Sequence, residues 1–371
     1  MQIGVPKEIK THEYRVGMTP VAVREAVAHG HEVIVETNAG HGIGAGDEVY
    51  LAAGAQIGAN AEEVFSRAEI IVKVKEPQER ERARLTPHHI LFCYLHLASD
   101  PDQAMNLVAS GATCIAYETV TSADGGLPLL AGGSEVAGRM SIQVGAHALE
   151  RANGGQGLLL GGVPGVEPGK VVILGGGVVG SNAATIAIGN GARVVVIDRS
   201  LDVLRRLTAQ FGSRIETAYS TAEVIEYHLR DADLVIGGVL TPGAASPKLV
   251  TRAMLSRMKR GSVLVDVSID QGGCFETSRP TTHAEPTYVE AGIVHYCVPN
   301  MPGAVPRTST YALSNATLPF ILQLADLGLS GALRSNPHLL NGLNIARGKV
   351  TNREVAGALG RPYVAPETLL E

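Results

Sequence analysis

The sequence has few of the features that mark secreted or metal-binding proteins. It has four cysteines in 371 residues and no CxxC pair. Three of the four lie in apolar runs, so we expect buried free thiols rather than disulfides or a zinc site. The cysteines are Cys93, Cys114, Cys274 and Cys297.

Long apolar runs and basic clusters are also missing. No run reaches the roughly 18 residues of a membrane-spanning helix, and the opening MQIGVPKEIK has no apolar signal-peptide core. A formal net charge of −5, with no block of basic residues, gives no sign of a nucleic-acid or anionic-membrane partner. We therefore expect a cytoplasmic protein that binds small molecules, with no nucleic acid and no membrane among its partners.

The sequence does contain enough apolar residues for two α/β domains, because 371 residues with 45% hydrophobic content are long for one domain. Runs rich in Val, Ile and Leu predict strands, and helical or turn segments separate them. The predicted strands are 1–5, 32–36, 70–74, 90–95 and 113–117 in a first sheet, and 171–174, 194–197, 215–218, 234–237, 263–267 and 293–298 in a second. The predicted helices are 134–151, 201–211 and 307–327, a helix that begins at Thr19-Pro20 and ends at Gly30, and the stretch after Gly180 through Ile188. The segments 60–67 and 101–110 are predicted as helical or turn stretches.

Two further segments bear on how the domains are connected. The glycine-rich stretch 154–169 is typical of a domain connection. The residues after 327 are too few for a domain of their own, so we expect them to pack back on the first sheet.

The stretch 170–198 is the most informative part of the chain. An apolar run leads into Gly175-x-Gly177-x-x-Gly180, a helix follows, and a second apolar run ends at Asp198. In such a βαβ unit the first glycine makes the tight turn, the second lets the backbone approach a pyrophosphate, and the third lets the helix pack on the strand. The phosphates would lie at the helix N-terminus, and the acid would accept hydrogen bonds from the ribose.

A glycine triplet alone can be a structural turn, but its position between strand and helix favours a dinucleotide site. Six strands counted from Val171 are the number that a complete dinucleotide-binding domain requires. The Asp198 carboxylate repels the 2′-phosphate of NADP and suits the free hydroxyl of NAD, which predicts NAD as the cofactor. Arg199 beside it leaves NADP open.

Four polar residues follow predicted strands, where ligands bind in open parallel sheets. Arg15 lies in the loop after the first strand, Lys75 ends IIVKVK, and His96 ends ILFCYLH. Asp270 follows VLVDVSI in the second sheet. Three come from one sheet and one from the other, which suggests a cleft with substrate on one wall and nicotinamide on the other.

Each of the four also has an ordinary structural explanation. Lys75 could be a solvated residue at a strand end, since Lys73 beside it shows that basic residues occur here anyway, and His96 could be a core histidine. Arg15 could belong to a charged loop, and Asp270 could cap the turn before two glycines. Their common placement favours the functional interpretation.

Hydride chemistry on an amino or hydroxy acid needs a cation for the substrate carboxylate, a proton-exchanging group and a charge that stabilises the reacting oxygen or nitrogen. Arg15 suits the carboxylate because its guanidinium can pair with two oxygens. Lys75 and His96 suit polarisation and proton transfer. A nicotinamide performs the redox step, so no metal is required.

Several motifs together resemble the L-alanine dehydrogenase family over nearly the whole chain. They are GVPKEIKTHEYRVGMTP, VKVKEP, YLHLA, the glycine loop, VDVSIDQGG and HYCVPNMPGAVPRTST. The NAD-binding subunit of proton-translocating transhydrogenases shares the opening motif, and YLHLA and SIDQGG separate the two groups. In the alanine dehydrogenase family these two motifs carry the catalytic histidine and aspartate, which implies catalytic roles for His96 and Asp270. The family's pyruvate-binding residues fall on Arg15 and Lys75.

The resemblance also implies residues that contact NAD, beyond the three glycines. They are Ser134, Val178, Val179, Asp198, Ser220, Val239, Leu240, Val267, Ser268, Ile269, Asp270, Arg279, Val298, Pro299, Asn300 and Met301. Val203 is a departure, because a basic residue often occupies this position near the adenosine in the family.

The expected fold is α/β, with two doubly wound Rossmann-like domains joined by long helices and an active-site cleft between them. Residues 1–130 with 307–371 would form the substrate domain and 131–306 the NAD-binding domain, and the family implies homohexamers. The expected activity is NAD-dependent interconversion of L-alanine with pyruvate and ammonium. Two alternatives remain at this point, a transhydrogenase NAD-binding subunit and a non-catalytic NAD-sensing module.

Overall fold

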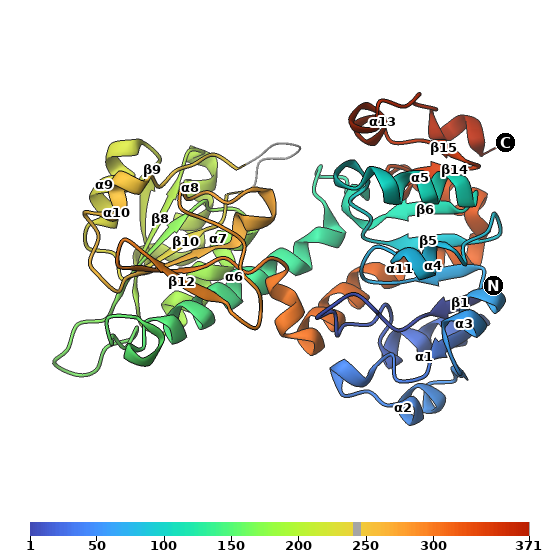
Figure 1. Ribbon diagram of the computed structural model, residues 1–371, viewed down its shortest axis with the longest axis horizontal. Coiled ribbons are helices and arrows are strands. Elements are labelled where there is room, and N and C mark those ends of the chain that lie inside the picture. Colours follow the sequence, from blue (N-terminus) through green and yellow to red (C-terminus); the bar gives the residue numbers. More distant parts are fainter. Residues whose placement is uncertain (240–245, 371) are drawn as a thin grey trace. The chain divides into compact units, whose positions relative to one another are not determined.

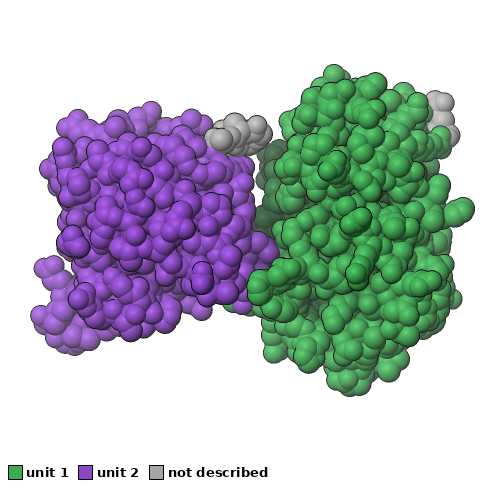
Figure 2. All heavy atoms as spheres, viewed as in Figure 1, with its two compact units in different colours: residues 1–133, 305–371 green, residues 134–304 purple. Residues whose placement is uncertain are grey.

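The chain forms two compact units in a computed structural model that describes residues 1–239 and 246–370. Unit 1 comprises Met1–Gly133 and Val305–Glu371, and unit 2 comprises Ser134–Ala304 (Figure 2). The roles expected for such ranges, substrate binding for 1–130 with 307–371 and NAD binding for 131–306, stay predictions.

Unit 1 is built on one mixed sheet. Its described residues form eight strands in the order β15-β14-β6-β5-β4-β1-β2-β3, parallel from β6 to β3. The strands are β1 (Gln2–Val5), β2 (Glu32–Glu36), β3 (Gln56–Gly58), β4 (Ile70–Val72), β5 (Ile90–Cys93), β6 (Thr113–Ala116), β14 (Leu343–Ala346) and β15 (Lys349–Val350). The five strands predicted for the first sheet are therefore confirmed, with ends that differ by up to two residues.

The C-terminal residues complete the unit 1 sheet, as expected for a tail that packs back. β14 pairs antiparallel with β6, and β15 pairs antiparallel with β14 (Figure 1). Both faces of the sheet are buried. Ile70 and Val72 lie in one apolar cluster and Ile71 in another, which explains why these strands appear in the sequence as continuous apolar runs.

Unit 2 has the doubly wound arrangement of a dinucleotide-binding domain. Its described residues form seven strands in the order β12-β13-β11-β10-β7-β8-β9. The strands are β7 (Lys170–Leu174), β8 (Arg193–Asp198), β9 (Glu216–Tyr219), β10 (Leu234–Gly237), β11 (Val263–Asp266), β12 (Thr287–Glu290) and β13 (Ile293–Tyr296). The six parallel strands follow the spatial order 3-2-1-4-5-6, and β12 adds an antiparallel edge. The predicted α/β class with two doubly wound sheets is confirmed.

Helices cover the sheets. Those of unit 1 are α1 (Pro20–Ala28), α2 (Asp47–Ala52), α3 (Ala61–Arg67), α4 (Glu79–Arg82), α5 (Pro101–Ser110), α11 (Pro306–Ser335), α12 (Pro337–Leu340) and α13 (Arg353–Leu359). Unit 2 contains α7 (Val178–Gly189), α8 (Leu201–Phe211), α9 (Ala222–Leu229) and α10 (Arg252–Leu255). α6 (Pro128–Ala148) runs from unit 1 into unit 2. It begins before the predicted helix 134–151, and α11 extends past its predicted end with a break at Gly328 (φ 67°, ψ 167°).

The glycine-rich stretch 154–169 is not a connection between the units, so this prediction is wrong. The whole stretch lies in unit 2, where the Gly157 N–H donates to Leu149 and the Gln156 N–H donates to Gly261. The chain instead passes between units inside α6 and again just before α11. The glycine content correctly indicated a segment rich in turns, but this segment lies inside unit 2 and not between the units.

Two sequence predictions concern apolar surroundings: that the cysteines are buried free thiols, and that no apolar run is long enough to span a membrane. All four cysteines are buried and free, as expected. Among the described residues, α11 is long and apolar enough to span a membrane by length and composition alone, although no uninterrupted apolar run marks it. Core helices of soluble proteins pass the same test, so this is weak evidence for a span.

Candidate active site

Three of the predicted site residues follow three adjacent strands of unit 1. Arg15 lies between β1 and α1, Lys75 follows β4, and His96 follows β5. Since β1, β4 and β5 are neighbours and parallel, their carboxyl ends meet at one edge of the sheet. The predicted grouping of these residues along a strand edge therefore agrees with the topology.

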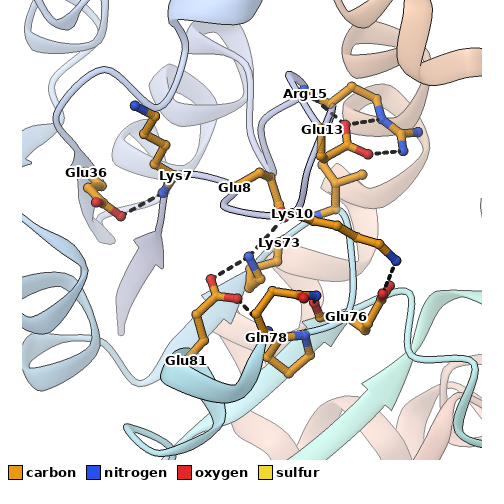
Figure 3. Close-up of polar contacts among 12 residues, drawn as sticks. Lys7, Glu8, Lys10, Glu13, Arg15, Glu36, Lys73, Glu76, Gln78 and Glu81 are labelled. Atoms are coloured by element: carbon orange, nitrogen blue, oxygen red, sulfur yellow. Dashed lines mark hydrogen bonds and ion pairs between the residues drawn. The ribbon is translucent and has the colours of Figure 1, made fainter. Parts of the chain in front are cut away.

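Glu13 holds the Arg15 guanidinium. Arg15 is buried, and its Nε and Nη2 donate to the two Glu13 carboxylate oxygens at 2.7 and 2.6 Å (Figure 3). Burial acts to raise the pKa of the Glu13 carboxyl, but hydrogen bonds and charge from Arg15 outweigh it and leave that pKa lowered. The sequence showed Glu13 only as a neighbour in a charged loop. The pairing means that Arg15 presents a fixed guanidinium.

Lys75 differs from an ordinary solvated lysine. Its side chain is half-buried, and among the described residues its ammonium has no hydrogen-bond or ion-pair partner. Burial lowers its pKa, and the nearby positive charge of Arg15 lowers it further. A partly desolvated cation next to a second cation is an electrostatically costly arrangement that suits an anionic ligand.

His96 is presented on a strained and well-held turn. Its backbone is left-handed (φ 50°, ψ 41°), and its N–H donates to Glu118 at 2.6 Å. The ring stacks on Tyr94 with centroids 5.9 Å apart and planes 6° apart. The side chain is 49% exposed, so it is not a core histidine. Glu118 was missed, although it follows β6 and the strand-end rule could have found it.

Asp270 lies on the short helix η6 (Val267–Gln271) that follows β11 in unit 2. Its side chain is exposed and makes no hydrogen bond to any described residue. The N-cap of η6 is Asp266, and the helix ends at Gly272 in the left-handed conformation. The capping role that could have explained Asp270 therefore belongs to Asp266.

Asp266 closes the loop that carries Asp270. Its buried carboxylate accepts the N–H of Ser268 at 3.1 Å, the N–H of Cys274 at 2.9 Å and the Ser278 hydroxyl at 2.5 Å. Burial raises the pKa of Asp266 despite these hydrogen bonds. One buried acid thus ties both ends of the loop, and it was not among the predicted residues.

The three glycines of unit 2 behave as the motif predicts. Gly175 has φ +95°, and a Cβ there would lie 2.8 Å from the Gly238 carbonyl oxygen. A Cβ on Gly180 would overlap the Gly175 carbonyl. Around Gly177 a Cβ would meet no described atom within 4 Å, and this glycine caps α7 without a side-chain hydrogen bond. The N–H groups of the first turn of α7 are thus available for phosphate oxygens.

Asp198 ends β8 beside this glycine loop. Its Oδ2 accepts the Gly176 N–H and its Oδ1 accepts the Ser200 N–H, both at 2.7 Å. Each carboxylate oxygen can accept more than one hydrogen bond, so ribose hydroxyls can still bind. Arg206, three residues after Val203 on α8, donates to the Gly176 carbonyl at 2.8 Å. A basic residue therefore reaches the loop from α8 even though position 203 is apolar.

Most other predicted cofactor residues lie after parallel strands of unit 2. Ser220 follows β9 and donates its N–H to Asp198, and Val239 follows β10. Val267, Ser268 and Ile269 lie on η6 after β11, while Val298, Pro299, Asn300 and Met301 follow β13. Val178 and Val179 begin α7, and Ser134 lies on α6.

The last two predicted cofactor residues are Arg279 and Leu240. Arg279 stacks on Tyr288, with its guanidinium carbon 3.9 Å from the ring centroid. Leu240 lies outside the described residues.

These residues fit a dinucleotide. The loop has the close turn, the open position and the uncapped helix N-terminus that a pyrophosphate needs, and an acid stands at the next strand end. In residues 1–239 and 246–370, no group of three or more His, Cys, Asp or Glu side chains could hold a metal ion.

Comparisons with known proteins give similarity over both units. Residues 4–137 match the family model "Alanine dehydrogenase/PNT, N-terminal domain", and residues 141–353 match "Alanine dehydrogenase/PNT, C-terminal domain". An alanine dehydrogenase of Halomonas elongata is 58% identical over 370 residues, covering 100% of both chains. A solved L-alanine dehydrogenase structure superposes with a TM-score of 0.95 at 50% identity, covering 97% of this chain and 99% of the other. A transhydrogenase from Sinorhizobium meliloti, at 23% identity, shares the fold with a TM-score of 0.81 and covers 95% of this chain and 99% of its own.

Proposed function

Because this chain belongs to the alanine dehydrogenase/PNT family, we propose that it is an NAD-dependent L-alanine dehydrogenase. It interconverts L-alanine, NAD and water with pyruvate, ammonium, NADH and a proton. The observation that carries the proposal is the row of Arg15, Lys75 and His96 after three adjacent strands of unit 1, in a chain whose unit 2 has the complete dinucleotide-binding strand order.

Unit 2 supplies the cofactor-binding residues. Bound NAD would supply the hydride acceptor for the substrate Cα, a redox chemistry that the side chains of the protein lack. Gly177 and the first turn of α7 would receive the pyrophosphate, and Asp198 would accept hydrogen bonds from the adenosine ribose. The family implies a pyridine nucleotide, and the Asp198 carboxylate supports NAD over NADP because it would face the 2′-phosphate.

Unit 1 supplies the substrate-binding cations. The substrate carboxylate pairs with Arg15, whose Nε edge is already taken by Glu13. Lys75 polarises the carbonyl oxygen of pyruvate or the hydroxyl of the carbinolamine. Its partly desolvated ammonium attracts an anion more strongly than a solvated lysine does.

His96 and Asp270 share the proton transfers. Loss of hydride from the neutral amine of L-alanine leaves an iminium ion, and water adds to it with loss of a proton to form a carbinolamine, which releases ammonia and leaves pyruvate. The added water must lose a proton and the leaving nitrogen must gain one, so one group acts as base and then as acid. The exposed imidazole of His96 and the exposed carboxylate of Asp270, which has no hydrogen bond to a described residue, are suited both to accept and to donate these protons.

A single assay separates this function from its rivals. The protein is mixed with L-alanine and NAD at alkaline pH, and NADH absorbance is followed. A dehydrogenase produces NADH. A transhydrogenase subunit would instead pass hydride to a second nucleotide, and a sensing module would bind NAD without turnover, so either outcome contradicts the proposal.

We further propose a cytoplasmic homohexamer that acts on small molecules alone, with no membrane or nucleic-acid partner. The net charge of −5 without basic clusters supports the last point. Only one third of the most apolar part of α11 is buried within one chain, which supports a subunit interface along this helix. Light scattering of the purified protein tests the hexamer, and a monomer would contradict it.

A further inference from the structure

Unit 1 contains a buried ionic cluster that the proposed reaction does not use. Lys73 is 0% exposed, and its Nζ lies 3.0 Å from Glu8 Oε2 and 2.7 Å from Glu81 Oε1 (Figure 3). Both carboxylates are themselves buried. In the sequence Lys73 was only a basic neighbour of Lys75, and no role was predicted for it. Burying one cation with two anions costs desolvation free energy, so the role of this cluster is to be sought in the backbone groups that its carboxylates also bind.

Glu8 also bonds the backbone next to Lys75. Its second oxygen, Oε1, accepts the Val74 N–H at 2.7 Å. Val74 lies between the cluster lysine and Lys75, just beyond the end of β4. Hydrogen bonds to an ionised acceptor are shorter and stronger than neutral ones, so this contact fixes the peptide between Lys73 and Val74, one residue before Lys75.

The segment 6–19, which carries Glu8, contacts the end of β4 at two further points. Lys10 pairs with Glu76, the residue after Lys75. A Cβ on Gly17 would overlap the Val72 carbonyl, so the two backbones run in direct contact there. Contacts therefore lie on both sides of Lys75.

Arg15 lies on this same segment, between the ion pair and the close backbone contact (Figure 3). We propose that Glu8 is a positioning residue that fixes Arg15 and Lys75 relative to each other as one substrate-binding surface. This inference rests on the proposed roles of those two cations. Glu8 touches no reacting atom and acts only through the backbone at Val74.

Glu81 provides a matched comparison within the cluster. It pairs with the same lysine, but its other oxygen accepts the Gln78 N–H at the start of α4. The two carboxylates outweigh burial and raise the pKa of Lys73, so the lysine stays charged. Removing either acid therefore leaves the same buried cation with one counterion fewer, but only the loss of Glu8 releases the Val74 peptide.

Glutamine is the informative substitution. At position 8 it must face two donors, the lysine ammonium and the Val74 N–H, with one carbonyl oxygen and an amide group that can only donate. One donor loses its acceptor, so the Val74 peptide shifts and Lys75 moves relative to Arg15. A displacement of about 1 Å at a binding group costs on the order of a hundredfold in efficiency.

Kinetics of Glu8→Gln and Glu81→Gln test the inference. We expect Glu8→Gln to raise the pyruvate KM about tenfold or more while the NADH dissociation constant stays within about twofold. Glu81→Gln should lose a similar amount of thermal stability yet keep its pyruvate KM within about threefold. Equal pyruvate KM values in the two variants would overturn the inference. If Glu8→Gln does not fold, Glu8→Asp replaces it, because the shorter side chain keeps the charge but cannot reach both Lys73 and the Val74 N–H, and an unchanged pyruvate KM there overturns the inference as well.

A second measurement does not need catalysis, so it separates failure of the inference from failure of the proposed function. Lysines are acetylated across a pH series, and labelling of Lys75 is followed by mass spectrometry. Charges near Lys75 come from Lys10, Glu13, Arg15 and Glu76. Removing an anion alone would lower its labelling midpoint. A change in the distance between Lys75 and Arg15 shifts the midpoint further, so a shift in Glu8→Gln that Glu81→Gln does not show supports the inference, and equal midpoints in the two variants overturn it.

Discussion

The carboxylate of Glu118 accepts the backbone N–H of His96 at 2.6 Å and also that of Leu95 at 3.2 Å. His96 is left-handed at φ 50°, a conformation that costs a non-glycine residue about 1–3 kcal/mol. The acid holds the turn in this strained state, and its Oε1 lies 4.0 Å from His96 Nδ1. The imidazole therefore depends on a residue from the next strand for its position.

Replacing Glu118 with Ala should lower kcat about tenfold or more, because the turn relaxes and the imidazole leaves its position. NADH affinity should not change, since the turn lies in unit 1. Steady-state kinetics and NADH titration measure both. Asp102→Ala, at an exposed acid on α5, is the control and should keep wild-type kcat. A normal kcat in folded Glu118→Ala would show that the position of His96 does not depend on this acid.

Asp270→Asn should reduce turnover about a hundredfold or more, because Asn cannot hold a negative charge or accept a proton at neutral pH. The melting temperature should stay unchanged, since the Asp270 side chain makes no hydrogen bond to a described residue.

The matched control is Asp266→Asn, four residues earlier. The N–H groups of Ser268 and Cys274 bond different oxygens of Asp266, and Asn keeps only one oxygen, so one buried donor loses its acceptor, which should cost about 1–3 kcal/mol and lower the melting temperature. Kinetics and thermal melts of both variants are compared. Near-normal turnover in Asp270→Asn would remove Asp270 from the catalytic residues.

Asp198→Ser should narrow the preference for NAD over NADP, because the anion that would face the 2′-phosphate is gone. The melting temperature should fall as well, since the Gly176 N–H loses its acceptor. Asp202→Ser on α8, at a side chain that is 91% exposed, should leave both properties unchanged. The readout is kcat/KM with each cofactor. Equal values in the unmodified protein would contradict the assignment of NAD.

The pH dependence of pyruvate binding should follow the ionisation of the Lys75 ammonium. Burial and Arg15 lower its pKa below the ordinary lysine value of about 10.4, so its charge is lost at lower pH than usual. As the pH is increased, the pyruvate KM should therefore begin to rise before the pH reaches the ordinary lysine pKa of about 10.4. In the same window the unfolded chain binds more protons than the folded one, so this group makes stability increase with pH.

Lys75→Arg serves as the comparison, because arginine stays charged throughout this range. Its pyruvate KM, measured at saturating NADH and ammonia, should not rise with pH in that window. A wild-type profile parallel to that of the arginine variant would show that the charge of Lys75 does not bind pyruvate.

The central strands were predictable because they are buried on both faces. β10 and β11 consist of four buried residues each, which leaves continuous apolar runs in the sequence. β12 was missed because its residues, Thr287–Glu290, are exposed or only half-buried at the sheet edge. β3 and β15 are three and two residues long, too short to show a period.

The residues of the candidate site also fall into two groups, those that could be predicted from the sequence and those that could not. Lys75, His96 and Asp270 could be found because strand ends can be located from apolar runs. The residues that hold them could not be assigned a role, because their partners lie far away in the chain. Glu8 and Lys73 are 65 residues apart, and Glu118 and His96 are 22 residues apart. A single sequence carries no signal for such pairs.

The pairing of β14 with β6 has a consequence for synthesis on the ribosome. Unit 2 is one uninterrupted stretch and can fold as soon as it emerges, whereas the sheet of unit 1 needs β14 from near the C-terminus. Until nearly the whole chain has been translated, β6 is an edge strand whose unpaired backbone groups can recruit a neighbouring nascent chain. Molecular chaperones would have to shield this edge while the ribosome finishes translation.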